Sequence, residues 1–197
     1  LEKFFETGAT YSDYFSRSMR DLGHEVFEVI YDFESAQKVW AQANNVSFNE
    51  KNWQIEIMLA QIELFCPDIV YLHSLVATPP KFAQLIRRQF PNLKSIVAYG
   101  GTPFPAWQAE GVDLLMVGMP HMCQEYKQKG VNTHLVYHGF DVTLLEKLKK
   151  YQSAGDERYL FTFLGSSGFG CQDFFVRRYW LLVELMLRCG LKGWINE

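Results

Sequence analysis

The sequence predicts an α/β fold in which a parallel β-sheet carries helices on both faces. Three observations carry this prediction. Short apolar runs recur along the chain, each ends in a polar or glycine-rich segment, and an amphipathic segment of helical period follows most of them. Such apolar runs are typical of buried parallel strands, and strands joined by right-handed helical crossovers assemble into one sheet.

The composition agrees with a globular domain and excludes several functions. The chain has 197 residues, of which 48% are hydrophobic and 16% aromatic, enough for a real core. A net charge of −3 with both signs interspersed offers no basic surface for nucleic acid or an anionic membrane. No apolar run approaches the ~20 residues that span a bilayer. The four cysteines lack CxxC spacing and predict buried, reduced thiols in a cytoplasmic protein, with no metal site.

The amino-terminal part predicts a helix followed by a strand. Residues 10–23 carry apolar side chains at helical intervals, and Gly23 suits the left-handed conformation in which many helices end. Residues 26–31 have the pattern of a strand. A helix–strand unit of this kind follows a first strand, which should precede Gly8. That strand is either cut off or reduced to residues 1–5, and we expect it to be cut off.

Two further helices are predicted before the central strand. Residues 34–44 form the first, with Val39 and Trp40 directed inward. In residues 51–66 the apolar side chains recur at i, i+3, i+4, i+7 and i+10, the clearest amphipathic pattern in the chain. Pro67 ends that helix.

The apolar run of residues 69–72 predicts a central strand, buried on both faces, whose carboxyl end delivers His73 and Ser74 to the edge of the sheet. In open α/β sheets this is the edge at which ligands bind. Histidine titrates near neutral pH, so His73 suits a general base or a hydrogen-bonding partner for a hydroxyl. A structural histidine that caps the following helix, in whose first turn Pro80 would lie, is an equally good interpretation.

Three more strands are predicted, over residues 93–99, 112–117 and 132–137. The first ends in Gly100, Gly101 and Thr102, which predict either a tight turn or a place where a ligand approaches the backbone closely. His121 follows the next strand at the start of a helix, a position that favours a helix cap over a catalyst.

A change of composition after residue 141 predicts a domain boundary. We assign residues 1–141 to a Rossmann-like domain, residues 142–158 to a linker helix and loop, and residues 159–197 to the beginning of a second, incomplete β/α unit. Gly165, Ser166 and Ser167 lie in the loop between its strand and its helix. Small residues before a helix N-terminus suit a phosphate, although the loop matches no standard nucleotide-binding spacing and a flexible turn is the alternative.

Several short motifs follow one another along nearly the whole chain. They are Tyr11-Ser12-Asp13-Tyr14-Phe15-Ser16-Arg17, Leu22-Gly23-His24-Glu25-Val26, Val39-Trp40-Ala41, Pro67-Asp68-Ile69-Val70-Tyr71-Leu72-His73, Tyr137-His138-Gly139-Phe140-Asp141 and Tyr159-Leu160-Phe161-Thr162-Phe163-Leu164-Gly165-Ser166. Their order and spacing resemble bacterial glycosyltransferases of the GT-B type, especially those related to the CgeB spore-maturation proteins. No single motif is specific to that family.

The resemblance implies an enzyme with two Rossmann-like domains that face a cleft. The N-terminal domain would receive the acceptor and the C-terminal one a nucleotide-sugar donor, with no cofactor besides these substrates. His73 would be the catalytic base or would position the acceptor. The other acceptor-binding residues implied are Gly8, Thr10, Tyr11, Ser74, Gly100, Gly101, Thr102 and His121. Gly165, Ser166 and Ser167 would bind the donor phosphates.

Because the sequence stops at Glu197, before the later donor-binding residues of such enzymes, we expect this chain alone not to transfer sugar. The apolar surface of an incomplete domain would favour self-association. The competing prediction is a non-catalytic α/β ligand-binding or interaction module, such as a receiver-like domain. A receiver would need an acidic cluster at its first and third strand ends, and the sequence shows none.

Overall fold

The computed structural model describes residues 13–137, 139, 145, 183–185 and 187–190 of the 197-residue chain. The chain divides into two compact units, Leu1–Lys149 and Lys150–Glu197. Nearly all of the described structure belongs to the first unit. In the second, residues 183–185 and 187–189 are helical, and the strand and glycine loop predicted after residue 159 lie outside the described residues.

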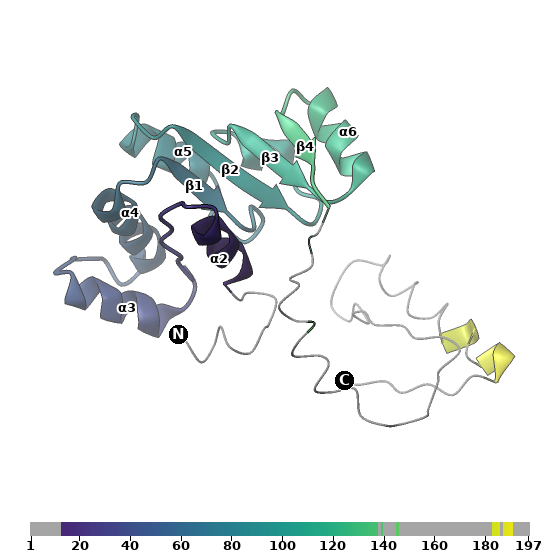
Figure 1. Cartoon of the computed structure of the whole chain (residues 1–197), viewed down its shortest axis with the longest axis horizontal. Coiled ribbons are helices and arrows are strands. Elements are labelled where there is room, and N and C mark those ends of the chain that lie inside the picture. The colour runs from purple at the N-terminus through teal and green to yellow at the C-terminus, as the bar shows by residue number, and fades with distance from the viewer. Residues whose placement is uncertain (1–12, 138, 140–144, 146–182, 186, 191–197) are drawn as a thin grey trace. The chain divides into compact units, whose positions relative to one another are not determined.

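The first unit is built on a parallel sheet (Figure 1). Its four strands are adjacent in the order in which they occur along the chain, and every pair is parallel. They are β1 (Ile69–Leu72), β2 (Ser95–Gly100), β3 (Leu114–Val117) and β4 (Thr133–Leu135). The structure confirms the predicted α/β class, consistent with a Rossmann-like fold.

Among the described residues of the first unit, five α-helices and one short 3-10 helix accompany the sheet. They are α2 (Tyr14–Asp21), α3 (Glu34–Ala43), α4 (Trp53–Phe65), α5 (Phe82–Gln89), η1 (Ala106–Ala109) and α6 (Pro120–Gln128). Their ends follow local chemistry. Cys66 adopts a left-handed conformation after α4, immediately before Pro67, and Pro120 occupies the first turn of α6, where no N–H is needed.

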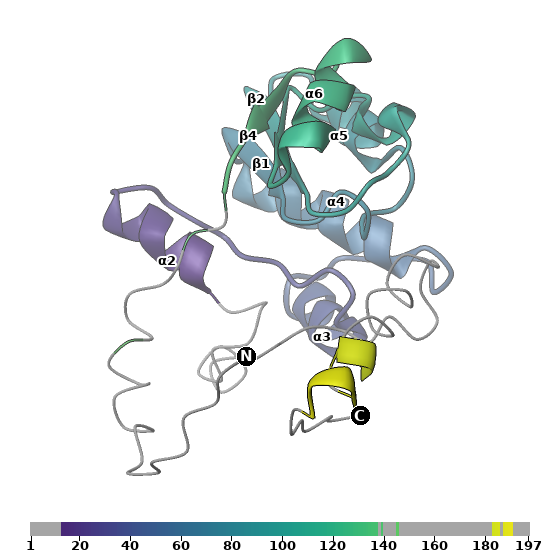
Figure 2. The same ribbon diagram turned by 90° about the vertical axis from the view of Figure 1, so that its right-hand side faces the viewer.

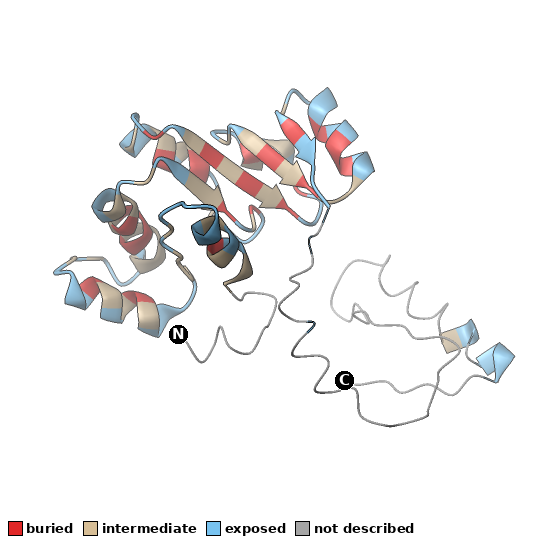
Figure 3. Cartoon of the chain, viewed as in Figure 1, coloured by how far each residue is buried: buried red, intermediate tan, exposed pale blue. Residues whose placement is uncertain are grey.

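The two faces of the sheet are covered differently. Side chains alternate along β2, so Ile96 and Ala98 lie fully buried on the face that packs against α4, α5 and α6 (Figure 3). The opposite face, which includes Val97 and Tyr99, is half-buried. Figures 1 and 2 show α2 on that second face. Helices therefore lie on both faces, but only one face belongs to a closely packed core.

Residues 26–31 do not form the predicted strand. They run without regular structure from α2 to α3 and are held by side chains: Gln37 Nε2 donates to the Ile30 carbonyl at 2.9 Å, and the Tyr31 hydroxyl donates to the Ala77 carbonyl. A strand needs a neighbouring strand to complete its backbone hydrogen bonds. Among the described residues the sheet ends at β1, and the positions expected to hold or precede a first strand, residues 1–12, are not described.

Two helix predictions need correction. Helix α5 begins at Phe82 and not at Pro80, because Lys81 has a φ of 63° and this left-handed residue interrupts the chain before the helix. On α3 the predicted inward residue Val39 is 64% exposed, and Trp40 is only half-buried. The buried residues of α3 are instead Gln37 and Ala41, which lie four residues apart on one face of the helix. The inward face is therefore shifted by one residue from the predicted one.

The prediction of buried cysteines holds for one of the three that the structure describes, and Cys171 lies outside the described residues. Cys123 is buried and free, whereas Cys66 and Cys189 are free and exposed. Among the described residues, no helix combines the length and the apolar character that a membrane crossing requires. The described part of the chain also contains no group of His, Cys, Asp and Glu side chains arranged to hold a metal ion.

We predict that Gly111→Ala destabilises the protein much more than Gly23→Ala. Both glycines have a positive φ, 88° and 89°, which costs an alanine about 1–2 kcal/mol. A Cβ at Gly111 would also lie 2.8 Å from the backbone nitrogen of Gln84 in α5, whereas no described residue comes within 4 Å of a Cβ at Gly23. Urea unfolding should show an additional loss of about 1–3 kcal/mol for Gly111→Ala. Equal losses in the two variants would contradict this packing.

Candidate active site

His73 and Ser74 lie where the sequence places them, at the carboxyl end of β1. His73 is exposed and Ser74 is half-buried. The next residue, Leu75, donates its N–H to the Tyr99 carbonyl oxygen at 2.9 Å, which ties this turn to β2. The turn is closed by the Ser74 carbonyl, which accepts the N–H groups of Ala77 and Thr78, both at 3.2 Å. His73 is therefore held at the edge of the sheet and is not packed inside the core.

Two tyrosine rings flank His73. The Tyr71 ring meets the imidazole edge-on, with 5.9 Å between centroids and an interplanar angle of 81°. The Tyr99 ring is nearly parallel to it, at 6.4 Å and 28°. Phe15 of α2 stacks on the far side of this cluster, 4.5 Å from the Tyr71 ring. Four aromatic rings from α2, β1 and β2 thus form a continuous row at the carboxyl edge.

Tyr71 and Tyr99 are not among the site residues that the sequence predicts. Tyr71 pairs with Val97 in the parallel register, so His73 and Tyr99, each two residues further on, reach the same edge and the same face. Tyr71 could have been predicted as a site residue, because it lies two residues before His73 at the end of one predicted strand. Tyr99 could be added only with the register of β1 against β2, which no local pattern specifies.

The two phenols at the site favour their neutral form. Burial raises the pKa of Tyr71 to about 12, and the neighbouring Tyr99 phenol adds to the effect. Burial also raises the pKa of Tyr99. The cause is the same for both, because a phenolate loses more hydration than a phenol when it leaves water. Near neutral pH both rings therefore carry a hydroxyl that can donate or accept a hydrogen bond.

The glycine pair after β2 has two different roles. A Cβ on Gly100 would lie 2.5 Å from a ring carbon of Phe104, so this glycine makes room for a core side chain and not for a ligand. A Cβ on Gly101 would lie 3.3 Å from the Tyr99 ring, and Gly101 and Thr102 are both exposed. Of the two glycines, only Gly101 leaves the backbone open to a ligand, and it does so beside Tyr99.

The loop that carries Gly101 and Thr102 is fixed by Tyr126 of α6. The Tyr126 hydroxyl donates to the Phe104 carbonyl at 2.8 Å and accepts the Phe104 N–H at 2.9 Å. The two rings stack at 4.7 Å with an interplanar angle of 19°. Both residues are buried. This pair therefore holds the turn after β2 against the helix that follows β3.

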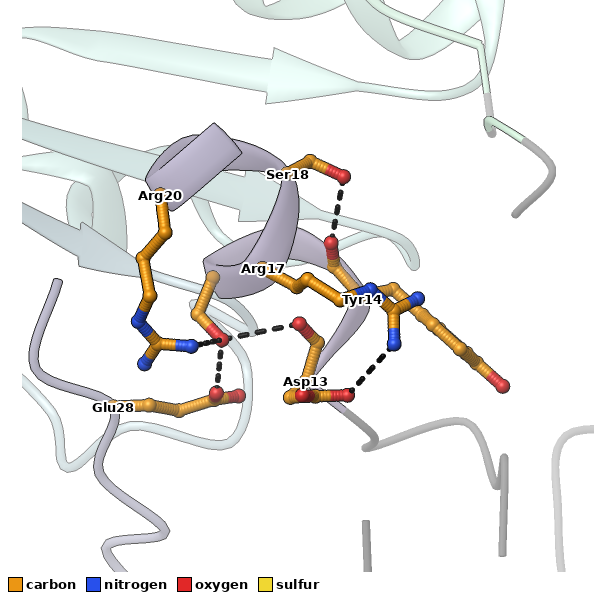
Figure 4. A network of polar contacts seen from close by, with 7 residues as sticks. Asp13, Tyr14, Arg17, Ser18, Arg20 and Glu28 are labelled. Carbon is orange, nitrogen blue, oxygen red and sulfur yellow. Dashed lines mark hydrogen bonds and ion pairs between the residues drawn. The ribbon is translucent and has the colours of Figure 1, made fainter. Parts of the chain in front are cut away.

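Polar contacts attach α2 to the segment that follows it (Figure 4). The buried Ser16 hydroxyl donates to the Glu28 carboxylate and lies 3.1 Å from the Asp13 carbonyl oxygen. Arg20 reaches the Ser16 hydroxyl at 3.5 Å and the Val26 carbonyl at 3.3 Å. These contacts hold α2 in place, and α2 in turn carries the Phe15 ring that covers Tyr71.

His121 occupies the second position of α6, after the carboxyl end of β3, and is exposed. It shares this edge of the sheet with His73, because the carboxyl ends of parallel strands lie at one edge. Six other predicted site residues lie outside the described residues: Gly8, Thr10, Tyr11, Gly165, Ser166 and Ser167.

Two hollows occur away from this edge. One, of about 170 Å³, lies between α3, α4 and the segment before them, and its lining is mainly apolar. The other, of about 440 Å³, lies at the opposite, amino-terminal edge of β3 and β4 and is lined in part by Trp107 and Gly111. We place the candidate site at the carboxyl edge instead, because the histidine and the two phenols gather there.

Comparison with protein-family models, with curated proteins and with solved structures found no significant match to this chain. The chain is therefore characterised by its own fold and by the residues of its candidate site. It is an α/β domain with a parallel sheet, and its described carboxyl edge presents one histidine between two neutral phenols.

We predict that Tyr71→Phe removes a phenol whose pKa burial raises to about 12. In an absorbance titration of the folded protein, the ionisation phase near pH 12 should therefore shrink in this variant. Because the folded state holds the Tyr71 proton more tightly than the unfolded state, its contribution to stability is complete below about pH 10 and is lost as the pH rises toward about 12. If the ionisation phase near pH 12 were unchanged in Tyr71→Phe, the Tyr71 phenol would not be buried as the structure has it.

We also predict that Tyr126→Phe destabilises the protein by about 1–3 kcal/mol in urea unfolding, because both backbone groups of Phe104 lose their buried partner. Tyr137→Phe is the matched control and should change the stability by less than about 0.5 kcal/mol, as expected for an exposed position. A loss as small as that of the control in Tyr126→Phe would show that this hydroxyl does not hold the loop.

Proposed function

We propose that this chain forms the acceptor-side domain of a GT-B-type glycosyltransferase of the CgeB-like kind, and that residues 159–197 belong to the domain that binds the nucleotide-sugar donor. One observation carries the proposal: His73 is exposed at the carboxyl edge of a parallel sheet, between the rings of Tyr71 and Tyr99. That edge is the usual ligand-binding edge of such sheets. The motif order along the chain supports the choice of reaction.

In this proposal His73 acts as the general base of the transfer. Its imidazole takes the proton of the acceptor hydroxyl while that oxygen forms a bond to the anomeric carbon of the donor. The bond between this carbon and the diphosphate breaks, and the nucleoside diphosphate leaves with the bonding electrons. A positioned base of this kind contributes about 10²–10⁴-fold to a rate. The exposed hydroxyl of Thr102 and the backbone at Gly101 lie at the same edge and would orient the acceptor.

The proposed binding site for the nucleotide-sugar donor is supported by the sequence alone. Gly165, Ser166 and Ser167 combine small side chains with a position before a predicted helix, which favours contacts between backbone N–H groups and a diphosphate. The nucleotide sugar is the only cofactor-like molecule that the proposal requires. Gly8, Thr10 and Tyr11, which precede α2 in the sequence, would complete the acceptor site in this scheme.

We further propose a cytoplasmic location and a tendency to self-associate. Cys66, Cys123 and Cys189 are free thiols, which supports a reducing compartment. Leu22 and Leu64 are 74% and 59% exposed, and apolar surface of this kind favours contact with another chain.

The test separates the two halves of the proposal. In the full-length protein, His73→Gln should lower transfer from nucleotide-sugar donors by about 10²–10⁴-fold and leave the thermal stabilisation by nucleoside diphosphates unchanged. Ser166→Glu should abolish that stabilisation, because a carboxylate repels the diphosphate. His24→Gln, which replaces an exposed histidine after α2, is the control and should change neither quantity.

Two results would overturn the proposal. If no nucleotide or nucleotide sugar shifts the melting temperature and no donor is consumed, the chain is a non-catalytic binding or interaction module. If His73→Gln transfers sugar as fast as the unaltered protein, the base lies elsewhere and His73 is a structural residue of the turn after β1.

A further inference from the structure

The segments that follow the first three strands carry no formal charge apart from histidine. Residues 73–80 after β1, 101–105 after β2 and 118–121 after β3 contain no Asp, Glu, Lys or Arg. All of these residues are described, and they follow the carboxyl ends of β1, β2 and β3, where His73 lies. A phosphate, a carboxylate or an ammonium group would gain no opposite charge from these three segments. Charge complementarity therefore favours a neutral ligand.

The rings at this edge form a surface on which a flat ligand can stack. Tyr71 and Tyr99 lie on adjacent strands, paired in register with Val97 and Met116 respectively. All four are half-buried, so this face combines ring surface with partly exposed apolar side chains. Gly101 adds no side chain beside the Tyr99 ring. Phe15 of α2 stacks on the Tyr71 ring, whereas the Tyr99 ring lies beside the exposed Gly101.

Hydrogen-bonding groups surround this apolar surface. Tyr71 and Tyr99 each bring a neutral phenol, His73 brings an imidazole, and Ser74 and Thr102 bring hydroxyls at the ends of β1 and β2. Each of them can donate and accept a hydrogen bond. An apolar floor with neutral donors and acceptors around it matches a sugar ring, which has C–H groups on its face and hydroxyls on its rim.

We propose that Tyr71, His73 and Tyr99 form the subsite for the acceptor and that this acceptor presents a neutral pyranose ring. That the ligand is an acceptor rests on the proposed transferase function. That it is a pyranose rests only on the aromatic rings and on the absence of charged residues from the three segments. The ring stacks on Tyr99 beside Gly101, and one of its hydroxyls faces the His73 imidazole. An acceptor with a phosphate or an amine at this position is disfavoured by the same chemistry.

The test is a titration of the full chain, labelled with ¹³C at its tyrosine and histidine rings, with methyl β-glucopyranoside, methyl β-galactopyranoside and methyl N-acetyl-β-glucosaminide. The ring resonances of Tyr71, His73 and Tyr99 should shift in a saturable manner with at least one of these pyranosides. Sorbitol, which has the hydroxyls without the ring, and inorganic phosphate should not shift them. Absence of a saturable shift with every pyranoside, or an equal shift with sorbitol or phosphate, overturns the proposal.

Three variants locate the binding. Tyr99→Ala should weaken pyranoside binding by roughly 3- to 10-fold, the range that one ring contact contributes. Gly101→Val places a side chain against the Tyr99 ring and should weaken it while leaving the ring in place. Trp107→Ala removes an exposed ring beside the hollow at the opposite edge and should have no effect. Unchanged binding in Gly101→Val overturns the placement even if Tyr99→Ala fails to fold.

This inference and the proposed function can fail separately. Saturable pyranoside binding in a protein that responds to no nucleotide would leave the sugar subsite standing and remove the transferase. Sugar transfer to an acceptor without a pyranose, with no response of the three rings, would leave the transferase standing and remove the subsite.

Discussion

The turn after β2 depends on one buried hydroxyl, and the geometry of the candidate site depends on that turn. Tyr126 satisfies both backbone groups of Phe104, and the Phe104 ring fills the space that Gly100 leaves empty. Because Phe104 is held on the core side, the residues between it and β2 must pass over the edge of the sheet. Gly101 and Thr102 are therefore exposed beside Tyr99. A core contact between the turn after β2 and α6 thus determines which residues of this edge are exposed to solvent.

On the side of the site formed by α2, side-chain contacts take the place of the backbone hydrogen bonds that a neighbouring strand would provide. The segment between α2 and α3 does not pair as a strand, yet Glu28, Gln37 and Tyr31 connect it to α2, to α3 and to the turn after β1. Contacts of this kind are individually worth about 0.5–1.5 kcal/mol, and more where a carboxylate takes part. They hold α2 over β1 and so keep Phe15 against Tyr71.

Periodicity predicted the strands and most helices because each is a local pattern that burial enforces. The apolar run of residues 69–72 and the amphipathic residues 51–66 were recognised in this way, and the structure has β1 and α4 there. Residues 26–31 show the limit of such patterns. They have the composition of a strand, but a strand forms only when a neighbour supplies the other half of its hydrogen bonds. Pro80 shows a second limit, since the left-handed Lys81 delays the start of α5.

The same distinction applies to the site. His73, Ser74 and Gly101 could be predicted, because their positions follow from the end of a single strand. Tyr99 could not, since its place beside His73 depends on the register of β1 against β2, and shifting that register by one residue would turn the Tyr99 ring to the other face. Gly100 was grouped with Gly101 although its neighbour Phe104 occupies its space. The neutral, aromatic character of this edge therefore depends on the pairing of the strands. It limits the classes of ligand that suit the edge more than any single residue does.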